Sequence, residues 1–211
     1  MRHRSASTLA IVGLSLALTA SLACAQDTVR VRGTVQGVDG DTIVVKSRDG
    51  TDLKVVPASN ALFVGVVKAS LADVKPGKFV GVTAMPQADG SQQAVEVHIF
   101  PEAMRGTGEG DRPYDYKPKS TMTNGTVSTA GKSTMTGAVE KSQGSTMTLK
   151  FKDGEKTIDV VPETVIVNYM PGDKSELRPG AKIYVPAATR QADGTLATAR
   201  VNVGRGVAPP M

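Results

Sequence analysis

The chain has 211 residues, one cysteine, no tryptophan and a formal net charge of +5. A single cysteine cannot form an internal disulfide, so a hydrophobic core must hold the fold, and the length suffices for one or two small domains. Basic and acidic residues alternate along the chain without a block of either sign, which argues against a nucleic-acid-binding stripe.

The first 25 residues are predicted to be a cleaved signal peptide. A short basic start precedes an apolar run over residues 9–23, and Ala23-Cys24-Ala25 supplies the small residues of a cleavage site. Cys24 could instead carry a lipid anchor, but Ser21 stands where such sites usually have leucine, so we expect cleavage after Ala25. The sequence therefore predicts an exported protein without a later membrane span, which in a bacterium would be periplasmic or secreted.

Alternating apolar residues then predict a series of short strands. Val31, Gly33 and Val35 share one face of the first strand, and Asp39-Gly40 and Asp49-Gly50 are strong signals for tight hairpins. The predicted strands cover residues 31–36, 42–46, 53–57, 79–85 and 93–100.

A helical turn and a tight turn separate the third strand from the fourth. Ser70 to Asp73 fits a capping box, and Pro76-Gly77 fits the central positions of a type II turn. The same order recurs at Asp173 to Glu176 and Pro179-Gly180, so the sequence predicts two similar domains.

The second copy is predicted to run from about Met135 to Val203. We expect Met135, Gly137 and Val139 to repeat the inward face of the first strand. The outward face differs between the copies, for example Glu96 against Arg200, as a one-sided core allows.

Five strands with a helical turn between strands three and four predict a small OB-like barrel in each copy. Gly33 and Gly137 support this, because a tight barrel needs a glycine where its first strand bends. We therefore expect an all-β protein of two tandem five-stranded OB-like barrels. The predicted segments are a signal peptide (1–25), the first barrel (26–102), a partly structured Gly/Thr/Pro-rich connector (103–132), the second barrel (133–204) and a disordered tail (205–211).

The duplicated order of strand, Asp-Gly turn, strand, Leu-x-x-(Lys/Arg)-Pro-Gly and strand resembles a family of exported bacterial OB-like domains of unknown function. Arg112-Pro113-Tyr114-Asp115 and Ser120-Thr121-Met122-Thr123-Asn124 are similar to a motif of a subgroup with paired domains, which more usually has tryptophan at the position of Tyr114. The resemblance covers most of the chain after the leader. It implies the fold and an envelope setting and, from a label on some relatives, a link to metal transport, but no catalytic residues.

A ligand, if one binds, is expected in the crevice between the two barrels. Arg112 would bind an anionic group, Tyr114 would stack, and Asp115, Thr121 and Asn124 would form hydrogen bonds. The other interpretation is that these residues only fasten the connector to both barrels.

Catalytic and metal chemistry find little support in the sequence. His98 is the only histidine after the leader and is predicted to be a solvated surface residue, whereas zinc and copper sites need several nitrogen or sulfur ligands. No Ser-His-Asp arrangement is recognisable. Glu109, Asp111 and Asp115 are interpreted as solvated loop acids, since their spacing does not fit a calcium loop. We therefore predict no cofactor, no metal site and no enzymatic activity.

The function expected from the sequence is a non-enzymatic binding or structural module of the bacterial envelope, acting on a small ligand or an envelope protein. Nucleic acid is not expected, because OB folds stack bases on aromatic side chains in a basic groove, and this chain has four Phe and four Tyr. The alternative is a periplasmic accessory or metal-binding component of a metal transport system. The ligand and the oligomeric state stay open.

Overall fold

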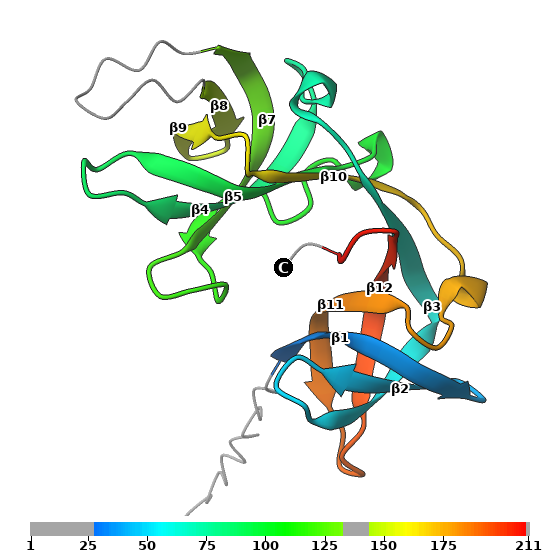
Figure 1. Cartoon of the computed structure of the whole chain (residues 1–211). Coiled ribbons are helices and arrows are strands. Elements are labelled where there is room, and N and C mark those ends of the chain that lie inside the picture. Colours follow the sequence, from blue (N-terminus) through cyan, green and yellow to red (C-terminus); the bar gives the residue numbers. More distant parts are fainter. Residues whose placement is uncertain (1–27, 133–143, 210–211) are drawn as a thin grey trace, which may run out of the picture.

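The computed structural model describes residues 28–132 and 144–209, and the regular secondary structure in this part is almost entirely β (Figure 1). The first strands are β1 (Thr28–Asp39), β2 (Thr42–Ser47), β3 (Asp52–Lys68), β4 (Phe79–Pro86), β5 (Gln92–Ile99) and β6 (Gly110–Pro113). The later strands are β7 (Thr121–Lys132), β8 (Ser145–Phe151), β9 (Gly154–Val160), β10 (Val165–Pro171), β11 (Lys182–Arg190) and β12 (Leu196–Arg205). Three short 3-10 turns complete the fold: η1 (Leu71–Asp73), η2 (Glu102–Met104) and η3 (Lys174–Glu176). The all-β fold class is confirmed.

Five strands close into a small barrel, here called the barrel lobe. Its order is β1, β2, β3, β12 and β11, and the parallel pairing of β12 with β3 closes it. Alternate residues of these strands fill the interior with aliphatic side chains, as a small barrel requires. They are Val31, Val35, Ile43, Val45, Val55, Ile183, Val185, Leu196, Val201 and Val203.

A second group of strands, here called the open lobe, wraps around its own core. Its strands are β4, β5, β7, β8 and β9, with β6 on the edge of β7, and β5 meets β9 at one residue pair, Gln93 with Asp159. The core is formed by residues such as Val82, Val97, Met147, Leu149 and Ile158. The expectation of two barrels is therefore confirmed for one, and a second closed barrel is not found in the described residues.

The barrel lobe also differs from a tandem arrangement, because it takes strands from both copies of the repeat. β1, β2 and β3 come from the first copy, whereas β11 and β12 come from the second. In return, β4 and β5 of the first copy pair with β7, β9 and β10 of the second. The physical reason is β3, whose 17 residues run out of the barrel lobe into the open lobe and deliver the chain there (Figure 1).

The first strand of the second copy begins earlier than the sequence pattern suggested. Val127 pairs with Leu149 on β8 as Val35 pairs with Val45 on β2, and both pairings are followed by a register shift. Gly125 is thus the counterpart of Gly33, and the assignment to Gly137 is wrong. A Cβ on Gly125 would lie 2.6 Å from the carbonyl oxygen of Lys150, and one on Gly33 would overlap the same oxygen of Lys46.

The turns were predicted correctly. Ser70 with Asp73 and Asp173 with Glu176 form the two capping boxes, ahead of β4 and β11. Gly77 and Gly180 both have positive φ, of 85° and 88°, which the Pro-Gly turns require.

The connector and the tail are more regular than expected. Residues 103–132 include most of η2 and the whole of β6 and β7. Of these, β7 is the first strand of the second copy. Arg205, expected in a disordered tail, ends β12 and pairs with Glu176 at 2.7 Å, and Val207 packs against a cluster between the lobes. The predicted leader and residues 133–143, with Met135, Gly137 and Val139, lie outside the described residues.

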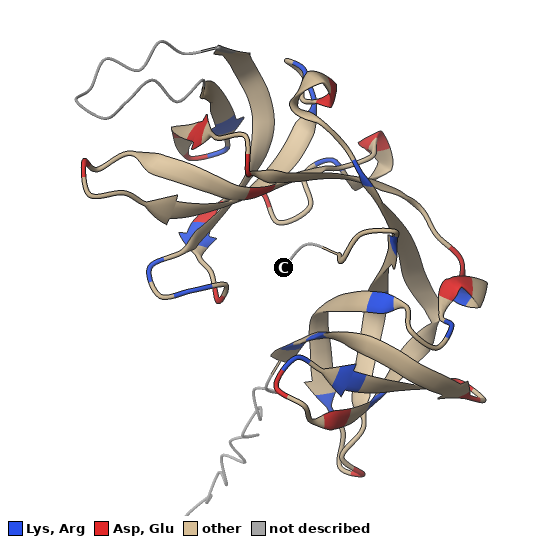
Figure 2. Cartoon of the chain, viewed as in Figure 1, with Lys and Arg blue, Asp and Glu red and all other residues tan. Residues whose placement is uncertain are grey.

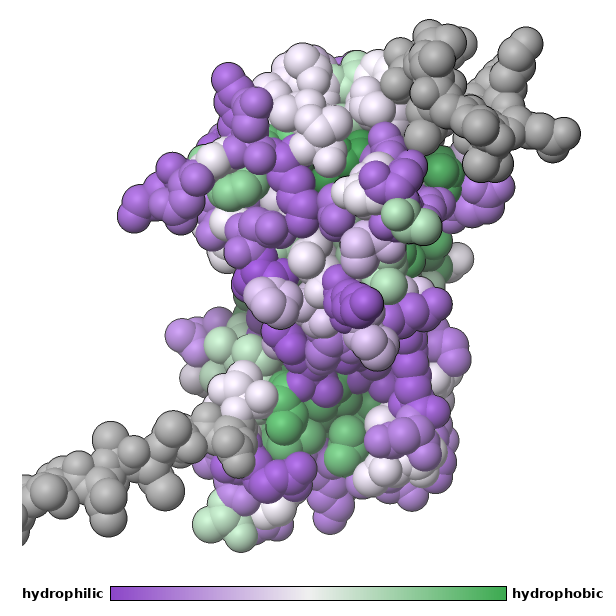
Figure 3. Space-filling view, turned by 90° about the vertical axis from the view of Figure 1, so that its left-hand side faces the viewer, coloured by the Kyte–Doolittle hydropathy of each residue, from purple (hydrophilic) through white to green (hydrophobic). Residues whose placement is uncertain are grey.

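The surface shows two lobes with a narrower waist between them, and apolar patches interrupt a mainly hydrophilic surface (Figure 3). None of the helical turns in the described parts of the chain is long and apolar enough to cross a membrane.

Candidate functional site

The outward faces of β5 and β12 meet at the waist and are buried there. His98 on β5 is 4% exposed and Asn202 on β12 is fully buried, because β10 and the second half of β3 bring the two lobes together over these faces. The prediction of a solvated surface His98 is therefore wrong. Strand alternation placed the residue outside the core of its own lobe, but the other lobe covers it.

His98 lies among aromatic rings and has an unsatisfied nitrogen. Its ring is 5.7 Å from that of Tyr169 and 6.3 Å from that of Phe100, and its Nε2 has no hydrogen-bond partner among the described residues. Burial, helped by the positive charge of Arg200, lowers the pKa of His98 to about 3. Oε1 of Glu96 is 3.8 Å from Nε2 and would favour protonation, but burial outweighs it, and the imidazole is neutral near pH 7.

Three tyrosine hydroxyls surround the same place. The hydroxyls of Tyr114 and Tyr184 lie 2.8 Å apart, and Nδ2 of Asn202 donates to the hydroxyl of Tyr169 at 3.3 Å. Burial raises the pKa of Tyr114 and of Tyr169 well above the ordinary value of 10.0. These phenols therefore stay protonated and can donate hydrogen bonds.

Asp115 holds the connector against the barrel lobe. Its carboxylate accepts from Arg32 at 2.8 Å and pairs with Arg30 at 3.2 Å. Partial burial opposes ionisation of Asp115, but the hydrogen bond from Arg32 and the two positive charges lower its pKa. Arg30 also lies 5.0 Å from the ring centre of Tyr114, so this group joins the connector to β1 of the barrel lobe.

Asn124 and Arg112 come from the paired strands β7 and β6. Nδ2 of Asn124 donates to the carbonyl oxygen of Thr107 at 2.8 Å, whereas its buried Oδ1 has no partner among the described residues. Nη1 of Arg112 donates to the carbonyl oxygen of Gly108 at 2.7 Å. Both residues are thus held by the loop before β6.

Most of these side chains line one cavity of about 130 Å³ between the lobes, here called the waist cavity. The polar side chains most important for its chemistry are His98, Arg112, Tyr114, Asn124, Tyr169 and Arg200. The lining also includes Arg30 and Tyr184 but no aspartate or glutamate.

The waist cavity unites three of the five predicted site residues: Arg112, Tyr114 and Asn124. Asp115 lies beside it in the ion pairs described above. Thr121 faces elsewhere, because its hydroxyl accepts from Nζ of Lys156 at 2.9 Å on the other side of β7.

Sequence reasoning missed His98, Tyr169 and Arg200. The available signal was that the outward face of β5, with Glu96 and His98, has polar counterparts at Arg200 and Asn202 on β12. Such a signal cannot be told from a solvated face until the packing of the two lobes is known.

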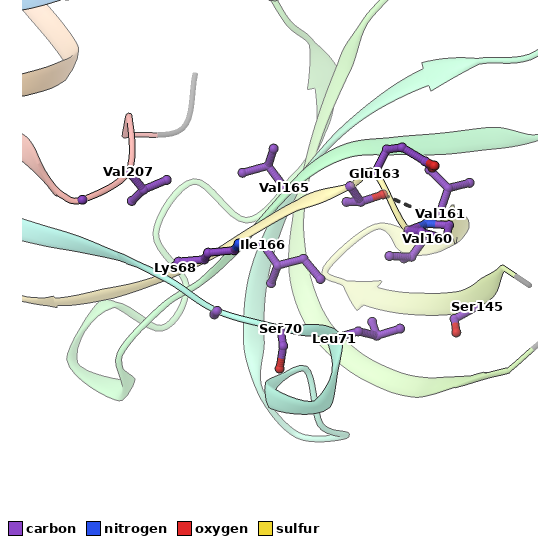
Figure 4. A pocket seen from close by; sticks show the side chains of 14 residues that line it. Lys68, Ser70, Leu71, Ser145, Val160, Val161, Glu163, Val165, Ile166 and Val207 are labelled. Atoms are coloured by element: carbon purple, nitrogen blue, oxygen red, sulfur yellow. Dashed lines mark hydrogen bonds between the residues drawn. The ribbon is translucent and has the colours of Figure 1, made fainter.

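Two other hollows have fewer polar side chains that are free to bind a ligand. One of about 730 Å³ lies between η1, β10 and the C-terminal segment, and aliphatic side chains such as Leu71, Val165, Ile166 and Val207 surround it (Figure 4). Another of about 300 Å³ lies on the basic face of the barrel lobe, where Figure 2 shows lysine and arginine on β1, β2 and β11. Arg32 and Lys46 there are already paired with Asp115 and Asp52.

No group of three or more His, Cys, Asp or Glu side chains gathers in a way that could hold a metal ion within residues 28–132 and 144–209.

Comparisons with protein-family models, curated proteins and solved structures give no match for this chain. The expected OB-like family is therefore supported only as far as a small mixed five-stranded barrel with additional strands, and no family is identified.

Proposed function

We propose that the protein is a non-enzymatic binding module of the bacterial cell envelope, which holds a small ligand in the waist cavity. The observation that carries this proposal is the pair of buried polar atoms at the cavity, Nε2 of His98 and Oδ1 of Asn124, that have no partner among the described residues. Leaving such atoms unpaired costs about 1–3 kcal/mol each, and a bound ligand would satisfy them.

A binding role fits the cavity better than catalysis. The pKa of His98, about 3, makes its imidazole a poor general base near neutral pH, and Tyr114 and Tyr169 have raised pKa values that keep their hydroxyls protonated. The lining has hydrogen-bond donors and acceptors but no activated nucleophile. The alternative role in metal transport gains no specific support from the described residues.

The test is retention of small molecules by the purified protein. The wild type, His98→Leu and Thr121→Val are dialysed against a defined mixture of bacterial metabolites, and the retained molecules are identified by mass spectrometry. We expect the wild type and Thr121→Val to retain the same compound and His98→Leu to lose it, because leucine cannot form the hydrogen bond. Thr121→Val is the matched control, since Thr121 lies on the other side of β7.

Melting curves of the three proteins exclude an effect of unfolding. Retention of nothing by the folded wild type would overturn the proposal, and so would unchanged retention by His98→Leu.

A further inference from the structure

The charge of the waist cavity points to the class of its ligand. Arg30, Arg112 and Arg200 line it, and the lining itself has no acidic residue. A carboxylate lies behind the lining, where Oε1 of Glu96 is 3.8 Å from Nε2 of His98. Arg30 is neutralised by Asp115 at 3.2 Å, but the hydrogen bond of Arg112 goes to a neutral carbonyl group. Nε of Arg200 is buried without a hydrogen-bond partner among the described residues. The guanidinium group of Arg112 and Nε of Arg200 are therefore available to an anion at this site.

The neutral groups of the cavity favour an oxyanion. The protonated hydroxyls of Tyr114 and Tyr169 can donate to anionic oxygens, and guanidinium groups match the geometry of carboxylate and phosphate. The unpaired Oδ1 of Asn124, in contrast, needs a donor. A ligand that carries both an anionic oxygen and an O–H or N–H group would satisfy all of these side chains.

The size of the cavity limits the ligand. A volume of about 130 Å³ is small beside the roughly 300–1,000 Å³ of pockets for drug-sized ligands. This volume favours a small acid or a phosphate ion.

We infer that the waist cavity binds a small oxyanion that also donates a hydrogen bond, such as a short hydroxy carboxylate or hydrogen phosphate. The inference rests on the proposed function, since it names the class of ligand for the same site. Arg112 and Arg200 bind the anionic oxygens, and Oδ1 of Asn124 accepts from the O–H group of the ligand.

The test is isothermal titration calorimetry of the full chain with three probes at constant ionic strength. Lactate and inorganic phosphate both carry an anionic oxygen and an O–H group, and propionate is close to lactate in size but lacks the hydroxyl. We expect lactate, phosphate or both to bind, and lactate to bind at least fivefold more tightly than propionate. The lactate and phosphate arms distinguish a carboxylate from a phosphate ligand.

Variants assign the binding to the cavity. Arg200→Gln and Arg112→Gln should each weaken binding about tenfold or more, because each removes a charged hydrogen-bond donor. Arg190→Gln is the matched control, since Arg190 is exposed on β11 and lies outside the cavity, and its binding should stay within twofold of the wild type. Two independent arginines are used, so that a folding defect in one variant, visible in its melting curve, leaves the other decisive.

Several outcomes would overturn the inference: no binding of any probe, equal binding of lactate and propionate, or full binding by both Arg200→Gln and Arg112→Gln. If none of the oxyanions binds but dialysis retains a neutral or cationic compound that depends on His98, the oxyanion class is wrong and the proposed function stands. If dialysis also retains nothing, both fail together.

Discussion

The imidazole of His98 is neutral in the folded protein, and this links stability to pH. Its pKa is about 3 when buried, against an ordinary value of 6.5. Between these pH values the unfolded chain therefore binds a proton that the folded protein does not. The contribution of His98 to the free energy of unfolding is greatest above pH 6.5 and falls on acidification toward pH 3, by about 1.4 kcal/mol per pH unit.

We predict that His98→Leu removes this part of the pH dependence. The variant should be at least as stable as the wild type at pH 7, because it replaces an unsatisfied buried polar group by an apolar one of similar size. Urea unfolding at pH values from 7.5 to 4.5 measures the effect. Asn202→Leu is the control, because Asn202 is the buried counterpart on β12 and does not titrate. An equal pH slope in His98→Leu and the wild type would show that His98 is not held neutral.

Residue positions within one strand could largely be predicted from the sequence, whereas their surroundings could not. Arg112, Tyr114 and Asn124 were recognised as candidates because a plain linker seldom carries such residues. His98 and Arg200 were not recognised, because alternation only says that they point away from the core of their own lobe. Whether that face meets water or another lobe is decided by packing between segments far apart in sequence.

At the level of single elements, β7 is the strand whose assignment differs most from the sequence pattern. Residues 120–127 and 133–139 have similar sequences, and alternation alone fits either as the first strand of the second copy. Gly125 decides the question, because its missing Cβ makes room for the carbonyl oxygen of Lys150.

We predict that Gly125→Ala and Gly33→Ala each lower the free energy of unfolding by about 2 kcal/mol or more, since the added methyl group would collide with backbone. Gly37→Ala and Gly131→Ala are the matched controls within the same strands, because nothing lies within 4 Å of a Cβ there. Chemical denaturation of these four variants and of Gly137→Ala provides the measurement. If Gly137→Ala were as harmful as Gly33→Ala while Gly125→Ala were tolerated, the sequence-based assignment would be right.

The hairpins and capped turns were predictable for a different reason. They depend on contacts within a few residues, such as Asp73 with Ser70, so the local sequence specifies them. Which lobe the β4–β5 pair joins is not specified locally, because the β11–β12 pair presents equivalent apolar faces. From the alternation of apolar residues alone, either pair of strands could complete either lobe.

At the scale of the whole molecule, the two copies are held together by exchanged strands. The barrel lobe cannot close without β11 and β12, and the open lobe lacks β4 and β5 unless the first copy supplies them. A shared apolar cluster between the lobes adds to this connection. It includes Phe79, Phe100, Tyr169, Val66 and Val167. The two lobes therefore form one cooperative structure.

We predict that cutting the chain between β6 and β7 leaves the two fragments associated. A protease site inserted between Pro118 and Lys119, in an exposed turn, would separate β1–β6 from β7–β12. After cleavage the fragments should co-elute in size-exclusion chromatography at the mass of the intact protein and separate only in denaturant.

Each fragment refolded alone should lack the circular dichroism of the native protein, and mixing the two should restore it. The uncut protein with the insertion serves as the control for tolerance of the inserted site. Fragments that elute separately without denaturant, each still folded, would contradict the exchange of strands.

The long separation in sequence between β3 and β12 also determines when the barrel lobe can fold during synthesis. Until Leu196–Arg205 has been made, β1–β3 cannot form the closed barrel, and the hydrogen-bonding edge of β3 that β12 later covers has no partner. Contacts that span so much of the sequence are formed slowly, and open strand edges are the usual starting points of aggregation. Nascent chains should therefore depend on chaperones until β12 has been made.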